Sequence, residues 1–257
     1  MRRLLVTLFV LSVTSIAYGR GNLSELTVPL KFVPQEGVQS STVDLRPEVL
    51  EQAVELRVED ARKLPDLLVI GKGTGGNDKV FPIHADREVR AFVQETLASI
   101  GKEWSLKTDG PPARILRVRI TAFDVDESNK ALGSIYTAEA KLAFDLETPQ
   151  GRVLATGVGS GSTHRYGHAH SPDNINEVLS DALKEAYSNV IGDSMLQTAW
   201  VSGKPSGTAT ASAGTATPAA PAESVEERLR KLDDLLKKGI ITKEEYQKKR
   251  AEILKDL

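Results

Sequence analysis

The sequence has 257 residues, of which 40% are hydrophobic and 26% are charged, and this composition is that of a globular protein with one or two domains. A formal net charge of −2 gives no overall field that would attract nucleic acid or an anionic membrane. The cysteine count of zero argues against disulfides, thiolate metal sites, cysteine nucleophiles and the lipid-bearing cysteine of bacterial lipoproteins.

Residues 1–19 have the layout of a secretory signal peptide, because two arginines precede a mostly apolar run over 4–16. Ala17 and Gly19 supply the small residues of a cleavage site, which predicts a mature chain beginning at Arg20. The apolar run is shorter than the roughly 20 residues that cross a bilayer. We therefore expect a periplasmic or otherwise exported protein, not lipidated and with no transmembrane segment after cleavage; retention as an uncleaved anchor is the alternative.

The first part of the main domain, residues 20–201, contains strand patterns. Apolar and charged residues alternate over 54–59, and this period of two predicts a half-buried strand. Two short apolar runs follow, at 67–70 and 80–83, and the glycine-rich stretch 71–76 between them is expected to be a flexible loop.

A helix is predicted over residues 87–100. Asp86 is expected to cap its first turn, and Gly101 is expected to end it. Its apolar positions at helical spacing are Val89, Phe92, Val93, Thr96, Leu97 and Ile100.

Three strands are then predicted, over residues 114–125, 135–147 and 152–160. The last two are separated by a short turn and should form an antiparallel hairpin. Ser171 followed by Pro172 marks the start of a second helix. The inward positions expected in the first strand are Leu116, Val118, Ile120 and Ala122.

This order of elements predicts an α+β fold: an antiparallel sheet with two helices packed on one face, plus a separate C-terminal α-helical hairpin. Residues 202–222 consist of Ser, Gly, Thr, Ala, Pro and one Lys, a composition that predicts a disordered linker. The hairpin occupies the remaining residues, 223–257.

Each helix of this hairpin begins with a capping box, formed by Ser224 with Glu227 and by Thr242 with Glu245. A segment this short forms only a small core, so its apolar stripe would gain by packing against a second copy or an envelope protein. A solvated hairpin without a partner is the alternative. The predicted interaction residues are Leu229, Leu232, Leu235, Leu236, Ile240, Ile241, Tyr246, Ile253 and Leu254.

The motif Gly-Ile-Ile-Thr-x-Glu-Glu-Tyr over residues 239–246 closely resembles the SHOCT family, a short domain at the C-terminus of many bacterial proteins. The resemblance implies an interaction or oligomerisation module without catalytic activity. Matching positions in the first helix and beyond the motif are Leu229, Leu232, Leu235, Lys238 and Lys249.

The main domain resembles the YajG-type family of uncharacterised envelope lipoproteins over residues 54–200. The features that carry the resemblance are Val58–Arg62, Ile70-Gly71, Ile100-Gly101 and the closing helix from Asn174 to Ile191. The resemblance supplies no catalytic residues. The chain departs from the family because it lacks the cysteine that bears the lipid.

Three histidines, His164, His168 and His170, cluster before the closing helix. Imidazoles at this spacing on a loop could ligate Zn²⁺, Ni²⁺ or Cu²⁺, with Asp173 adding an oxygen. A periplasmic metal-binding protein is therefore the alternative function, although an ordinary polar loop explains the same residues.

Patterns for catalysis or nucleotide binding are incomplete. The glycines of 71–76 spell G-x-G-x-x-G, but the next predicted helix begins too far beyond them to hold a pyrophosphate. Ser160 and Ser162 precede His164 without the G-x-S-x-G turn of a nucleophile elbow. The basic run Arg114, Arg117 and Arg119 is read as a solvated strand face, so no nucleic-acid partner is expected.

The sequence thus favours a non-catalytic exported envelope protein, without a cofactor, whose main domain serves binding or assembly. The C-terminal hairpin would mediate homo-oligomerisation or docking to an envelope protein partner.

Overall fold

A computed structural model describes residues 24–34, 43–75, 79–130 and 133–206, and all elements below lie within these ranges. The predicted signal peptide, residues 207–222 of the predicted linker and the C-terminal hairpin with its interaction residues lie outside the described residues. Their boundaries therefore stay predictions.

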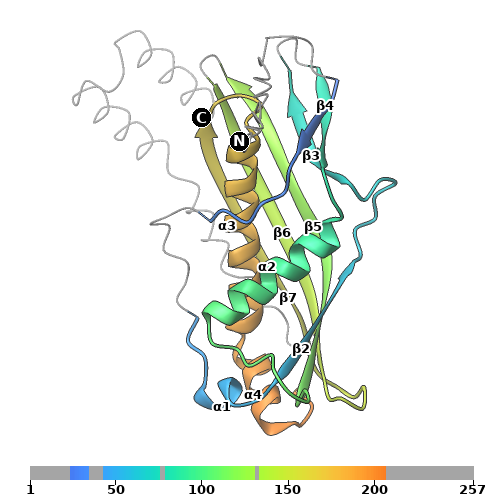
Figure 1. Ribbon diagram of the computed structural model, residues 1–257, viewed down its shortest axis with the longest axis vertical. Helices are drawn as coiled ribbons and strands as arrows, with labels where there is room; N and C mark the ends of the chain where they lie inside the picture. Colours follow the sequence, from blue (N-terminus) through green and yellow to red (C-terminus); the bar gives the residue numbers. More distant parts are fainter. Residues whose placement is uncertain (1–23, 35–42, 76–78, 131–132, 207–257) are drawn as a thin grey trace, which may run out of the picture.

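Seven strands form one sheet, and helices α2, α3 and α4 lie on one face of it (Figure 1). The α+β class is confirmed. The elements are β1 (Leu26–Val28), α1 (Pro47–Leu50), β2 (Val54–Asp60), β3 (Val69–Thr74), β4 (Val80–Ala85), α2 (Val89–Glu103), β5 (Arg114–Lys130), β6 (Gly133–Glu147), β7 (Val153–Gly167), α3 (Pro172–Ile191) and α4 (Ser194–Ser202). The strand order is β1-β4-β3-β5-β6-β7, with β2 also paired to β5.

The sheet is mixed, which corrects the predicted antiparallel sheet. Strands β5, β6 and β7 are antiparallel, as the hairpin prediction required, but β2 and β3 run parallel to β5, and β1 runs parallel to β4. Apolar alternation reports which face of a strand is buried and carries no information on its direction. The connection from β2 to β5 contains α2 and is long enough for the crossover that parallel pairing needs.

A bulge in β5 between Ile120 and Ala122 changes the face on which every later residue lies. The prediction of Ala122 as an inward residue is wrong for this reason. Phe123 and Val125 are buried in its place, and Glu127 follows them onto the inner face with 0% of its surface exposed.

The glycine-rich stretch predicted as a loop is, in its first part, strand β3. Gly71 has φ +148°, and a Cβ at this position would lie 1.9 Å from the carbonyl oxygen of Val125 in β5. The glycine therefore permits close pairing of the two strands, a role that composition alone does not distinguish from a flexible turn.

Helix α2 buries the predicted apolar stripe, but both of its predicted ends are wrong. Asp86 accepts a hydrogen bond from the N–H of Leu30 at 2.9 Å, and the helix begins at Val89 without a side-chain cap. Gly101 lies within the helix, which continues to Glu103. The Asp86 carboxylate, which the local pattern predicts as the helix cap, thus binds the backbone of a segment that is distant in the sequence.

Helix α3 begins as predicted, because the hydroxyl of Ser171 accepts the N–H of Asn174. It packs closely on β7: a Cβ at Gly161 would lie 2.1 Å from the carbonyl oxygen of Ala182. The glycines of β7 thus allow helix and strand to approach.

Helix α4 was not predicted. It buries Trp200 completely, and the Arg114 guanidinium donates to the Trp200 carbonyl oxygen at 2.9 Å. None of the helices in the described ranges is long and apolar enough to cross a bilayer.

Three side-chain amides on helices α2, α3 and α4 bind extended backbone segments. Each accepts from one N–H and donates to the carbonyl two residues earlier, at 3.0–3.1 Å: Gln94 with Val58 and Leu56, Asn176 with Lys31 and Pro29, and Gln197 with Arg46 and Asp44. The amide thereby replaces a neighbouring strand for the segment that it binds.

Candidate functional site

The three histidines predicted as a metal site occupy different structural positions. His164 lies on the exposed face of β7, opposite Thr137 of β6, and not on a loop. His168 and His170 follow the strand, and His170 has φ 56°. In the part of the chain that the structure describes, no group of three or more His, Asp or Glu residues is arranged to hold a metal ion. The metal site stays a prediction.

His170 belongs instead to a cluster around the buried carboxylate of Glu127. One carboxylate oxygen accepts from the Ser134 hydroxyl at 2.7 Å and from the His170 N–H at 2.7 Å. The Tyr136 hydroxyl lies 3.1 Å from the same oxygen, and the His170 ring nitrogen lies 3.3 Å from the carboxylate. The ring of His170 also packs edge-on against Phe81 of β4. The cluster joins three strands to the connection between β7 and α3.

Burial raises the pKa of Tyr136 far above its usual value, so its hydroxyl stays protonated and can donate. The same hydroxyl accepts the Ser171 N–H at 3.0 Å, directly before α3. The polar groups of the cluster are therefore bonded to one another. The bond from the Ser171 N–H to Tyr136 attaches the start of α3 to β6. Glu127 was not among the predicted site residues. The signal in the sequence is that this acidic residue shares the alternation of the apolar residues Phe123 and Val125.

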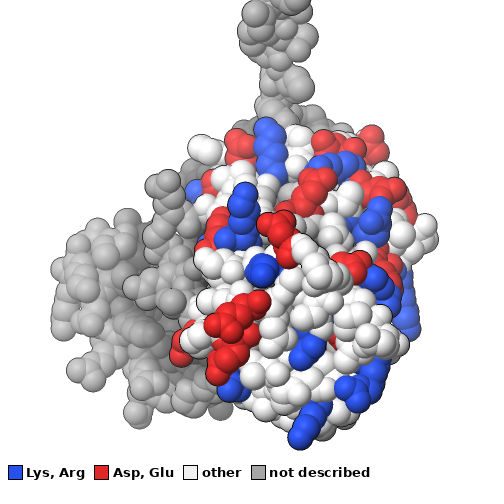
Figure 2. Space-filling view, turned by 60° about the horizontal axis from the view of Figure 1, so that its bottom comes forward, with Lys and Arg blue, Asp and Glu red and all other residues white. Residues whose placement is uncertain are grey.

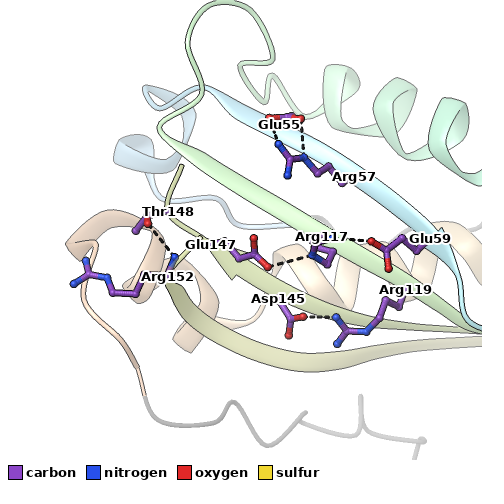
Figure 3. A network of polar contacts seen from close by, with 9 residues as sticks. All are labelled: Glu55, Arg57, Glu59, Arg117, Arg119, Asp145, Glu147, Thr148 and Arg152. Atoms are coloured by element: carbon purple, nitrogen blue, oxygen red, sulfur yellow. Dashed lines mark hydrogen bonds and ion pairs between the residues drawn. The ribbon is translucent and has the colours of Figure 1, made fainter. Parts of the chain in front are cut away.

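The opposite face of the sheet carries ordered charges on β2, β5 and β6 (Figure 3). Arg117 lies between Glu59, at 2.6 Å, and Glu147, at 3.1 Å, while Arg119 pairs with Asp145. Hydrogen bonds to Glu147 and Glu59 raise the pKa of Arg117. We call this set, with Glu55 and Arg57, the charge ladder.

The arginines suggested by the sequence as a basic patch are thus engaged by protein groups: Arg117 and Arg119 by carboxylates, and Arg114 by the end of α4. On the side of the molecule seen in Figure 2, acidic and basic side chains are interspersed.

Beside the charge ladder, the outward positions of β7 carry no permanent charge. We call them the neutral stripe: Thr156, Val158, Ser160, Ser162, His164 and Tyr166. Val158 is 41% exposed and Tyr166 is 56% exposed. They pair across the sheet with Ala143 and Ile135 of β6. Between these two positions, the facing residues of β6 are Thr137, Glu139 and Lys141, the last two of which form an ion pair.

The backbone edge of β7 is partly covered. Glu185 of α3 accepts the Ser162 N–H at 2.9 Å, and Asn189 donates to the Ser160 carbonyl at 2.7 Å. Such coverage blocks strand addition at these positions. The side chains of the neutral stripe are exposed or half-buried.

Two family profiles match the sequence. The profile described as "Uncharacterized lipoprotein" matches residues 42–200, and the profile described as "Short C-terminal domain" matches residues 227–254. Both resemblances inferred from the sequence are thereby confirmed. No curated protein matches the chain.

Solved structures to which the chain is similar include a Xanthomonas campestris protein of the DUF330 family, with 10% identity and a TM-score of 0.44. That alignment covers 70% of this chain and 99% of the other. A minor lipoprotein from Acinetobacter baumannii has 10% identity and a TM-score of 0.32, covering 55% of this chain and 90% of the other.

Proposed function

We propose that this chain, which belongs to the uncharacterized lipoprotein family, is an exported envelope protein that binds a partner protein without bond-making chemistry. Its export is supported by the signal-peptide pattern of residues 1–19. The proposed organisation is this leader, the domain of residues 20–201, a linker over 202–222 and the SHOCT hairpin over 223–257.

The observation that carries the proposal is a sheet face on which no helix of the described residues packs. Helices α2, α3 and α4 pack on the other face, and the neutral stripe lies beside the charge ladder on this one. An apolar centre with an aromatic residue and a charged rim is the usual anatomy of a protein–protein interface. Val158 and Tyr166 would supply an apolar contact at each end of the uncharged centre formed by Ser160, Ser162 and His164, and Arg119 with Asp145 would lie on the rim.

Site-specific photo-crosslinking in intact cells tests this surface. A crosslinking amino acid at Ser162, between Val158 and Tyr166, should give a discrete adduct with one envelope protein. The matched control is the same amino acid at Arg90 on α2, whose side chain is 50% exposed on the covered side of the sheet. Adding Val158→Asp should abolish the adduct at Ser162. Equal adducts at both positions, or an adduct insensitive to Val158→Asp, would contradict the proposal.

A further inference from the structure

Three leucines are exposed within five residues on the connection between β2 and β3. Leu64, Leu67 and Leu68 have 41%, 46% and 40% of their surfaces exposed. Figure 1 shows this connection projecting beyond the edge of the sheet. Single exposed leucines are ordinary, but a cluster at a projecting site marks an interaction surface. We call residues 63–68 the leucine loop.

A buried ion pair fixes the base of the leucine loop. The side chains of Arg62 and Asp60 are 3% and 8% exposed, and their closest atoms are 2.8 Å apart. The guanidinium also donates to the carbonyl oxygens of Leu67 and, at 2.9 Å, of Val69. Burying a charged pair is unfavourable unless such hydrogen bonds compensate it. The pair therefore specifies one loop conformation.

The backbone at the end of the loop is fixed as well. The N–H of Leu68 donates to the Asp66 carboxylate at 2.8 Å, and its carbonyl accepts the Ala85 N–H at 2.8 Å. Both main-chain groups of Leu68 are thus bonded within the protein, one of them to the half-exposed carboxylate of Asp66, while the leucine side chains remain exposed.

From this geometry we infer that the leucine loop inserts into the surface of a lipid bilayer. A loop that projects from the domain can enter a bilayer, because a bilayer surface deforms around it. Leucine is under-represented among the residues that dominate protein–protein affinity, which are mainly Trp, Tyr and Arg. Lys63, exposed at the start of the loop, can place its ammonium group among lipid headgroups while its stem follows the leucines. This inference rests on the envelope location in the proposed function but uses a different surface.

Vesicle co-sedimentation of the protein purified after export tests the inference. Vesicles of phosphatidylethanolamine and phosphatidylglycerol should retain the wild type, also at high salt, because the contact is apolar. The variant L64S/L67S/L68S should partition at least about tenfold more weakly, from the apolar area of three leucines. The matched control is V80S, which removes an exposed valine of β4 and should bind as the wild type does.

The cysteine-free sequence allows a second measurement that reports on the loop itself. An environment-sensitive fluorophore on Lys63→Cys should shift to shorter wavelength with vesicles, and the same label on Val80→Cys should not. The shift must disappear when Lys63→Cys is combined with the three serines.

Equal sedimentation of the wild type and the triple variant, loss of binding at high salt, or equal shifts at both labels would overturn the inference. These outcomes leave the crosslinking result at Ser162 unaffected, so the two proposals can fail separately.

Discussion

Glu127 illustrates at the scale of single residues how one buried group determines a connection. Three donors, on Ser134, Tyr136 and the backbone of His170, lie within 3.1 Å of one of its oxygens. A buried donor left without an acceptor loses about 1–3 kcal/mol. The carboxylate matters chiefly as the acceptor of the His170 N–H, because the Tyr136 hydroxyl also contacts the His168 carbonyl oxygen and the Ser134 hydroxyl also contacts Asn129.

Glu127→Leu should destabilise the protein by about 1–3 kcal/mol, because it leaves the His170 N–H without its acceptor. The hydroxyls of Tyr136 and Ser134 keep second acceptors, on His168 and Asn129. Glu127→Gln should cost less, since one amide oxygen can still accept. Urea unfolding monitored by circular dichroism measures both. The control is Asp126→Asn, whose ion pair with Lys72 is exposed and should contribute less than about 1 kcal/mol. If all three variants unfold at the same urea concentration, the cluster has no special role.

The same residue shows why the site could be predicted only in part. The alternation of apolar and polar residues in β5 correctly predicts the buried face up to Ile120. The bulge then inserts one residue, so Glu127 reads as outward unless the bulge is known. His170 was identified as notable, but its partner on a strand 43 positions away could not be inferred from local spacing.

At the scale of elements, the amides of Gln94, Asn176 and Gln197 attach extended segments to helices. Helical periodicity identified the apolar stripes of α2 and α3, because burial repeats along a helix. It did not explain why Asn176, 2% exposed, lies among buried positions of α3. The reason is the segment at Pro29–Lys31, which is distant in sequence and lacks a marked pattern of its own.

Asn176→Asp should release this segment, because the aspartate loses the donor to Pro29 and places an oxygen against the carbonyl. We expect a loss of about 1–3 kcal/mol in the free energy of unfolding. Hydrogen exchange measured by mass spectrometry should accelerate in residues 29–33. Gln94→Glu is the reciprocal control: it should accelerate exchange in β2 and leave 29–33 unchanged. Identical exchange maps for the two variants would refute the attachment of each segment to its own amide.

At the scale of the whole molecule, the α+β class could be predicted because strands and helices segregate along the chain. The direction of β2 and β3 could not, since it depends on how the connection through α2 crosses the sheet. Within residues 24–206, apart from the gaps given above, the helices that pack on the sheet lie on one face, so the other face presents side chains of the strands. The sheet face, the leucine loop and the C-terminal hairpin can each be tested without altering the others.

The hairpin of residues 223–257 offers the test of assembly at this scale. Its apolar stripe favours self-association, because so short a segment buries little area alone. Light scattering of the full chain should give a mass above that of one chain. Deletion of 223–257, or Leu232→Asp with Leu236→Asp, should reduce it to one chain. Lys237→Asp, off the stripe, should leave it unchanged. A mass insensitive to the deletion would exclude the hairpin as the oligomerisation element, and it would direct attention to docking on a different protein.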